Sequence, residues 1–114
     1  MKPSVYIETT IVSYIVAGPS RDLIVAAHQQ ITNEWWKNVR AKVDCFVSSF
    51  VIDEAGRGDR VLAPRRLALI RDFGLLDVNE SIGELAARYF AALNIPDRSR
   101  IDSFHLAVAA WHNM

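Results

Sequence analysis

Short apolar runs alternate with longer amphipathic segments along the chain. The runs at residues 4–7, 44–48 and 75–78 are short and rich in strand-forming residues. The first run has no alternation of apolar and polar positions, as is typical of a strand buried on both faces of a parallel sheet. Strands separated by helices in this way predict an α/β fold with a parallel sheet.

Helices are predicted between and after these runs. Thr9 and Thr10 are expected to cap the first of them, and Ser81 and Glu84 have the spacing of a capping box at the start of a later one. The expected helices span residues 11–16, 20–39, 49–55, 62–73, 81–93 and about 98 to the end.

Two helices have apolar positions at steps of three or four, which predicts a buried stripe on each. In the second helix this stripe comprises Ile24, Ala27, Ile31, Trp35 and Val39, and in the last helix it comprises Ile101, Phe104, Val108 and Trp111. Trp36 lies about 100° from Trp35 around the second helix. It is therefore a candidate for a surface that contacts a partner protein.

Composition narrows the class of protein. The chain has 114 residues, enough for one domain with a core, and its 51% hydrophobic and 23% charged residues are typical of globular proteins. Its 13 basic residues balance 13 acidic ones, which argues against nucleic-acid binding through bulk charge. The single cysteine, Cys45, excludes an internal disulfide.

The apolar runs also bear on the cellular location of the protein and on whether the domain is whole. No apolar stretch approaches the length of a membrane span, and the first apolar run is too short for a signal peptide. We therefore expect a cytoplasmic protein without a membrane association. The chain consists of a single domain, residues 1–114, that ends within a predicted helix. A strand is expected after that helix, so the domain is interpreted as truncated at its C-terminus.

Three carboxylates occupy matching positions at the ends of predicted strands or the starts of the helices that follow. Glu8 ends the first strand, Glu54 lies on the short helix after the second strand, and Asp102 lies in the first turn of the last helix. In a parallel sheet the carboxyl ends of the strands meet along one edge, where ligands bind. Acids that converge there repel one another unless a cation offsets their charge, and Mg²⁺ or Mn²⁺ suits an all-oxygen site.

Each acid also has a purely structural interpretation. Asp102 and Ser99 have the spacing of a capping box, Glu54 is compatible with a solvated helix surface, and Glu8 with a loop acid that pairs with an arginine. His105 lies three residues after Asp102 and therefore shares a helix face with it. It is interpreted as a residue that orients a carboxylate or packs under the site, in preference to a metal ligand.

Three stretches together resemble the PIN domain, in particular the VapC-type toxins of toxin–antitoxin pairs. They are VYIETTIVSYI at the start, SSFVIDEAGRGD in the middle and IPDRSRIDSFHLAVAA near the end. The resemblance covers essentially the whole chain. It implies a three-layer α/β/α sandwich and a ribonuclease that depends on Mg²⁺ or Mn²⁺.

The resemblance also implies roles for individual residues and partners. Glu8, Glu54 and Asp102 match the first three acidic positions of the family, and Thr9 or Thr10 matches the hydroxyl that supports the first acid. Proteins of this kind typically form homodimers and are silenced by a cognate, VapB-like antitoxin whose tail occupies the active-site groove. Four arginines near the acids are candidates for contacts with RNA phosphates: Arg57, Arg60, Arg98 and Arg100.

Two departures from the family pattern leave a second function open. The first acid is usually Asp where this chain has Glu8, and the family carries a further acid beyond the point where this chain ends. The longer side chain of Glu8 changes the geometry available to Mg²⁺, which demands near-ideal octahedral coordination. The alternative is therefore a catalytically weak or inactive PIN-like protein that binds RNA or an antitoxin-like partner. A flavodoxin-like small-molecule binder is less favoured, because no phosphate-cradling loop follows the first strand.

Overall fold

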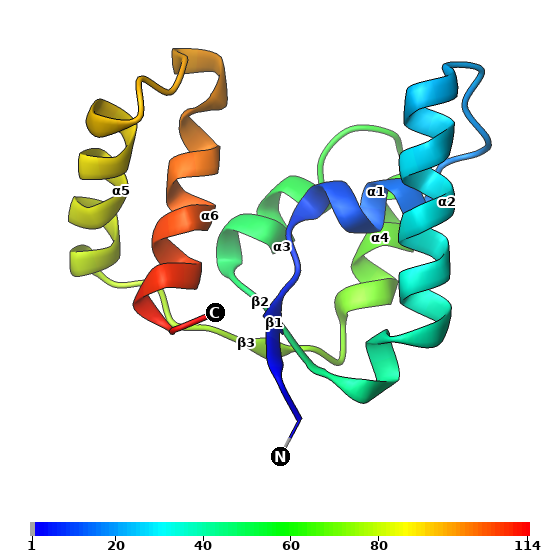
Figure 1. Ribbon diagram of the computed structural model, residues 1–114, viewed down its shortest axis with the longest axis horizontal. Coiled ribbons are helices and arrows are strands. Elements are labelled where there is room, and N and C mark those ends of the chain that lie inside the picture. The colour runs from blue at the N-terminus through cyan, green and yellow to red at the C-terminus, as the bar shows by residue number, and fades with distance from the viewer. Residues whose placement is uncertain (1) are drawn as a thin grey trace.

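The computed structural model describes residues 2–114, and it has a small parallel sheet flanked by helices (Figure 1). The strands are β1 (Ser4–Tyr6), β2 (Asp44–Val47) and β3 (Gly74–Leu75). Their order in the sheet is β1-β2-β3, and both pairs are parallel. The α/β class with a parallel sheet is thus confirmed.

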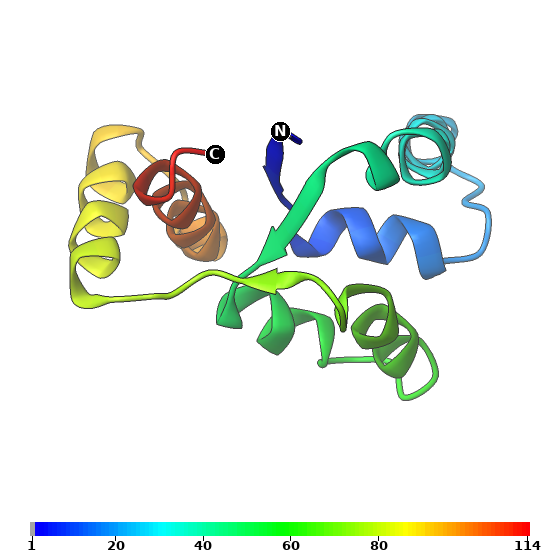
Figure 2. The same cartoon turned by 90° about the horizontal axis from the view of Figure 1, so that it is seen from below.

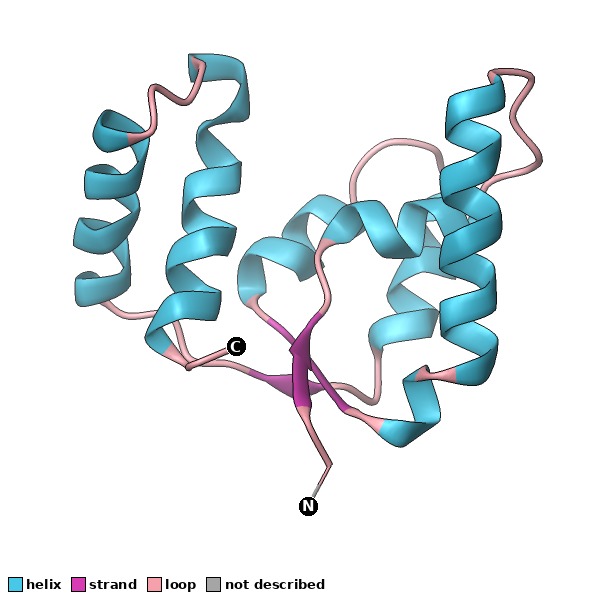
Figure 3. Cartoon of the chain, in the orientation of Figure 1, coloured by secondary structure: helices cyan, strands magenta, loops and turns pink. Residues whose placement is uncertain are grey.

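Helices occupy most of the remaining chain, as Figure 3 shows. They are α1 (Thr9–Val16), α2 (Leu23–Asn38), α3 (Ser49–Ala55), α4 (Leu62–Ile70), α5 (Glu80–Ala92) and α6 (Arg100–Trp111), with short 3-10 turns at Arg40–Lys42 and Asp97–Ser99. Viewed from below, α1 and α2 lie on one side of β2 and α3 and α4 on the other, while α5 and α6 form a separate helical hairpin beside the strands (Figure 2). No helix within residues 2–114 is long and apolar enough to cross a membrane.

The capping residues differ from those expected. Asn79 caps α5 by accepting a hydrogen bond from the Ile82 N–H at 2.9 Å, so the predicted capping box of Ser81 and Glu84 is wrong. Ser99 precedes α6 without a side-chain cap bond, so the predicted capping box with Asp102 is also wrong. Because a helix start is selected by whichever side chain reaches the free N–H groups, motif spacing alone did not identify it.

Two clusters of buried side chains lie on either side of the sheet's centre. The first joins β1, β2, α1, α3 and α4, and its buried members are Ile7, Val12, Val47, Val51, Ala55 and Ile70. The second joins the α5–α6 hairpin to the strands, and its buried members are Leu76, Ile82, Ala86, Ala107 and Val108. Tyr6 packs against both clusters and therefore lies where the hairpin meets the sheet.

The predicted buried stripe of α2 is wrong for most of its members. Ile24 and Ile31 are 71% and 64% exposed, whereas Gln29 and Thr32 are buried. Gln29 is buried because its amide bonds the preceding turn, accepting from the Ser20 N–H at 3.0 Å and donating to the Gly18 carbonyl at 3.1 Å. These bonds rotate α2 so that part of its apolar face points to solvent.

The tryptophans and the last helix show further differences. Trp35 and Trp36 are both half-buried and pack against the first core cluster. The Trp36 ring lies 5.8 Å from that of Phe73, which makes it a core contact in addition to any partner contact. In α6, Val108 is buried as predicted, whereas Trp111 is 49% exposed.

Candidate functional site

The carboxyl ends of β1 and β2 lie side by side and open into α1 and α3. The Ile7 N–H donates to the Phe46 carbonyl at 2.8 Å, which continues the ladder to the last residue before Glu8. Helix α3 starts at Ser49, directly after β2, and α6 lies on the adjacent side of β1 (Figure 1). Three elements that are distant in sequence thus meet at one edge of the sheet.

Glu8 lies at this edge as the N-cap of α1. Its backbone is extended, and its Oε1 accepts a hydrogen bond from the Thr10 N–H at 3.1 Å. A carboxylate is favourable there because it meets free N–H groups at the positive end of the helix dipole. This contact engages one oxygen and explains why a charge follows β1. The predicted burial of that strand on both faces is wrong, because β1 is at the edge of the sheet, with Ser4 exposed and Val5 and Tyr6 half-buried.

Glu54 lies on α3 and forms the centre of a hydrogen-bond group. Its Oε1 lies 2.9 Å from Oγ1 of Thr9 and 2.5 Å from Nε2 of His105. The side chain of His105 is 8% exposed and that of Glu54 is 28% exposed. His105 therefore bonds a carboxylate, and this carboxylate belongs to a different helix from Asp102, with which it was expected to share a helix face.

The supporting hydroxyl also differs from the expected one. The family resemblance assigned Thr9 or Thr10 to Glu8, whereas the hydroxyl of Thr9 donates to Glu54. Thr10 contacts Glu8 only through its backbone N–H. The helical turn of α1 points Thr9 toward α3, which sequence spacing could not reveal.

Asp102 lies in the first turn of α6, where it is exposed. It lines a shallow depression of about 350 Å³ together with Tyr6, Glu8, His105, Leu106 and Ala109. Two of the three predicted acids, 94 positions apart, thus face the same depression, and the third is bonded to a residue that lines it. The structure brings the three acids to one region.

Tyr6 and Ser48 complete the group and were missed from the sequence. The Tyr6 hydroxyl lies 2.7 Å from Nδ1 of His105 and 2.8 Å from Oγ of Ser48. The pKa of Tyr6 is raised to about 12, mainly by burial; the hydrogen bond to Ser48 lowers it in part, and the carboxylates of Glu54 and Glu8 contribute smaller upward shifts. One signal was available: Tyr6 precedes Glu8 by two residues in extended chain, so both point to the same side.

The depression is lined by two carboxylates, which are the kind of ligand that a hard divalent cation binds. Carboxylate oxygens are the ligands that Mg²⁺ and Mn²⁺ prefer, and Mg²⁺ commonly binds through one or two carboxylates while keeping several waters. Across residues 2–114, however, no three acidic, histidine or cysteine side chains lie close enough together to hold one ion directly. Glu8 and Asp102 both line the depression, whose remaining surface is mostly apolar, and they are the residues that would hold such an ion.

The four candidate arginines have different surroundings. Arg57 pairs with Asp53 one helical turn away, and both side chains are exposed. The Arg100 guanidinium lies 3.9 Å from the centre of the Phe90 ring and 3.4 Å from Asp97. Arg60 and Arg98 are exposed and form no ion pair within the described part of the chain. Of the four, they are therefore the two that are better placed to contact an external phosphate.

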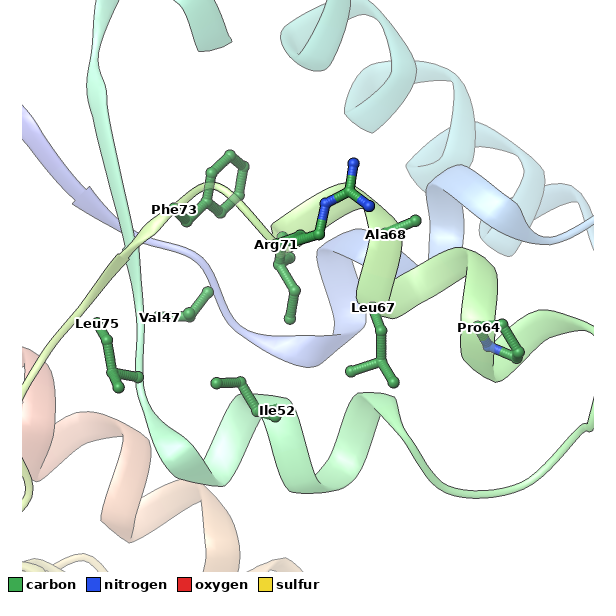
Figure 4. A pocket seen from close by; sticks show the side chains of 9 residues that line it. Val47, Ile52, Pro64, Leu67, Ala68, Arg71, Phe73 and Leu75 are labelled. Carbon is green, nitrogen blue, oxygen red and sulfur yellow. The ribbon is translucent and has the colours of Figure 1, made fainter.

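A larger depression of about 560 Å³ lies away from the acids, between α3, α4 and β3 (Figure 4). Figure 4 shows Ile52 on α3 and Leu67 on α4 beside it, with Val47 and Leu75 on the strands. Its lining contains one charged side chain, Arg71, and no carboxylate, histidine or hydroxyl. It therefore offers apolar surface and no group for acid–base or metal chemistry.

Comparison with known proteins adds no relative to this description. Searches against protein families, curated proteins and solved structures found no match to the chain. The acids, the histidine and the tyrosine at the edge of the sheet are therefore the features from which a function can be inferred.

Proposed function

We propose that the protein is a metal-dependent endoribonuclease of the toxin type, similar to the PIN-domain VapC toxins. It hydrolyses RNA phosphodiester bonds at the depression lined by Glu8 and Asp102. The observation that carries this proposal is the meeting of Glu8, Asp102 and the Glu54–His105 pair at the carboxyl edge of a parallel sheet. Ligand sites in open parallel sheets are found at such edges.

The residues have distinct roles under this proposal. Glu8 and Asp102 hold Mg²⁺ or Mn²⁺ in the depression, and Glu54 contributes negative charge from below, kept in place by His105 and Thr9. A divalent cation in such a site supplies positive charge for the phosphodiester transition state and lowers the pKa of the attacking water. Arg60 and Arg98 provide positive charge for RNA phosphates at the margin.

Cleavage of RNA with and without metal tests the proposal. We expect the purified protein to cleave RNA in the presence of Mn²⁺ or Mg²⁺ and to lose activity when the metal is chelated. Asp102→Asn should lower the rate by about a hundredfold, because it removes charge from the reacting region. Asp97→Asn is the matched control, since Asp97 is exposed in the turn before α6 and does not line the depression. Equal activity of Asp102→Asn and the parent chain would reject this site.

Two partners belong to the same proposal: a second copy of the chain and a VapB-like antitoxin. Large apolar side chains on the surface of α2 support an interface, since Leu23, Ile24 and Ile31 are all mostly exposed. Exposed apolar patches commonly mark protein–protein contacts. Sedimentation equilibrium tests the homodimer, and a monomer at every concentration tested would contradict it.

A catalytically weak or inactive binding protein is the second candidate. Its support is that Glu8 already caps α1 and that no three ligands within residues 2–114 converge on one point. Calorimetric titration with Mn²⁺ separates the two candidates. Binding that is lost in Asp102→Asn favours the ribonuclease, whereas no binding at millimolar metal favours the binding protein.

A further inference from the structure

Tyr6 is the residue of the site to which no role has been assigned. It lies at the end of β1, packs against both core clusters and contacts two polar side chains through its hydroxyl. Nδ1 of His105 lies 2.7 Å and Oγ of Ser48 2.8 Å from that hydroxyl. A continuous hydrogen-bond chain thus connects Ser48, Tyr6, His105, Glu54 and Thr9.

The Glu54 carboxylate sets the direction of the bonds on both sides of it and, with a neutral imidazole, of the bonds beyond His105. An ionised carboxylate only accepts hydrogen bonds, so Nε2 of His105 donates its N–H to Glu54. In a neutral imidazole the other nitrogen is then an acceptor, so the Tyr6 O–H donates to Nδ1. The Tyr6 oxygen in turn accepts from the Ser48 hydroxyl.

Ser48 holds the Tyr6 hydroxyl from the other side. It is the N-cap residue of α3, a position where serine normally accepts a hydrogen bond from the helix. Its side chain makes no cap bond and is completely buried, and Tyr6 is its hydrogen-bond partner. The Ser48 hydroxyl therefore bonds Tyr6 in place of the helix N-terminus, and this bond holds the Tyr6 side chain.

We propose that Tyr6 is a positioning residue of the candidate site: its hydroxyl, held by Ser48, bonds Nδ1 of His105 and thereby holds the ring with Nε2–H aimed at Glu54. The effect on catalysis rests on the proposed function, whereas the position of the ring rests on the hydrogen bonds alone. Without the hydroxyl, Nδ1 loses this bond, and the imidazole is free to turn away from Glu54.

Nitrogen NMR tests the assignment without reference to activity. The chain has three histidines, so the His105 signals in long-range ¹H–¹⁵N spectra can be assigned with His105→Gln. At a pH well above 7, we expect one protonated nitrogen, Nε2, and an unprotonated Nδ1 whose shift reflects the hydrogen bond from Tyr6. Tyr6→Phe should move the Nδ1 shift toward that of a nitrogen without a hydrogen bond, and Ser48→Ala should cause a smaller change in the same direction.

Tyr14→Phe is the matched control, because Tyr14 packs against His28 and takes no part in the hydrogen bonds that connect Ser48 to Thr9. It should leave the His105 signals unchanged. A proton on Nδ1 in the parent protein, protons on both nitrogens, or identical His105 signals in Tyr6→Phe would overturn the assignment.

Kinetics test the positioning role. We expect Tyr6→Phe to lower kcat for RNA cleavage about tenfold with little change in KM, and Tyr14→Phe to match the parent chain. Normal kcat in Tyr6→Phe together with a changed Nδ1 signal would overturn the positioning role. Absence of RNA cleavage by the parent protein would contradict the proposed function, and the NMR comparison would still decide whether Tyr6 fixes His105.

Discussion

Nε2 of His105 lies 2.5 Å from Oε1 of Glu54, although 51 positions separate the two residues. This pair connects α6 to α3 and brings the depression lined by Asp102 and Glu8 next to a third acid. Because the imidazole is almost completely buried, the contact is held within the fold and does not depend on a flexible surface side chain.

Loss of the imidazole should destabilise the fold. His105→Ala removes one of the two hydrogen-bond partners of the Tyr6 hydroxyl and of the Glu54 carboxylate, and the loss of a partner by a buried polar group costs about 1–3 kcal/mol. Urea denaturation measures this cost. The control is His112→Ala, which removes only a hydrogen bond to the Asp77 carbonyl and should change stability by about 0.5 kcal/mol or less. Similar losses in both variants would contradict a special role for His105.

The two neighbouring threonines should behave differently. Thr9→Val removes the hydroxyl that donates to Glu54 and should lower RNA cleavage about tenfold, the equivalent of one hydrogen bond of about 1.4 kcal/mol. Thr10→Val keeps the backbone N–H that bonds Glu8 and should be close to the parent chain. The reverse order of activities would mean that the hydroxyl of Thr10 supports the site.

Alkaline pH should reveal the burial of Tyr6. Burial favours the neutral phenol and raises its pKa in the folded state from the ordinary value of 10.0 to about 12. Tyr6 therefore stabilises the fold fully below pH 10, and this contribution is lost as the pH rises from 10 to 12. The free energy of unfolding, measured across this range, should fall more steeply for the parent chain than for Tyr6→Phe. Parallel curves would show that the phenol is not perturbed.

Gly74 should tolerate no side chain. It pairs with Phe46 across β2 and β3, and a Cβ at this position overlaps the Phe46 ring. Gly74→Ala should cost about 1–3 kcal/mol of stability, because the ring is fixed between the sheet and the second core cluster. Gly83→Ala, within α5 and with no atom near its Cβ, should gain about 0.5–1 kcal/mol. Denaturant midpoints that move in the same direction would contradict this explanation.

The sequence by itself determined the class of fold and the position of the acids along it. The predicted strands at residues 4–7 and 44–48 correspond to β1 at 4–6 and β2 at 44–47, because short runs of β-branched and aromatic residues favour strands. Glu8 follows the first strand and Glu54 lies in the helix after the second, so parallel pairing alone takes both to one edge. These conclusions need only local pattern and the geometry of parallel strands.

Tertiary structure decided which side chains meet. The face of α2 depends on the bonds of Gln29 to the turn at residues 18–20, and no periodicity encodes those bonds. The partner of His105 depends on how the α5–α6 hairpin docks against β1 and α3, a contact between residues far apart in the chain. Hydrogen bonds act over about 3 Å and are directional, so a rotation of one helix exchanges one partner for another. For this reason the sequence identified His105 as a support for an acid, whereas only the folded chain shows that the acid is Glu54 and that Tyr6 holds the other nitrogen.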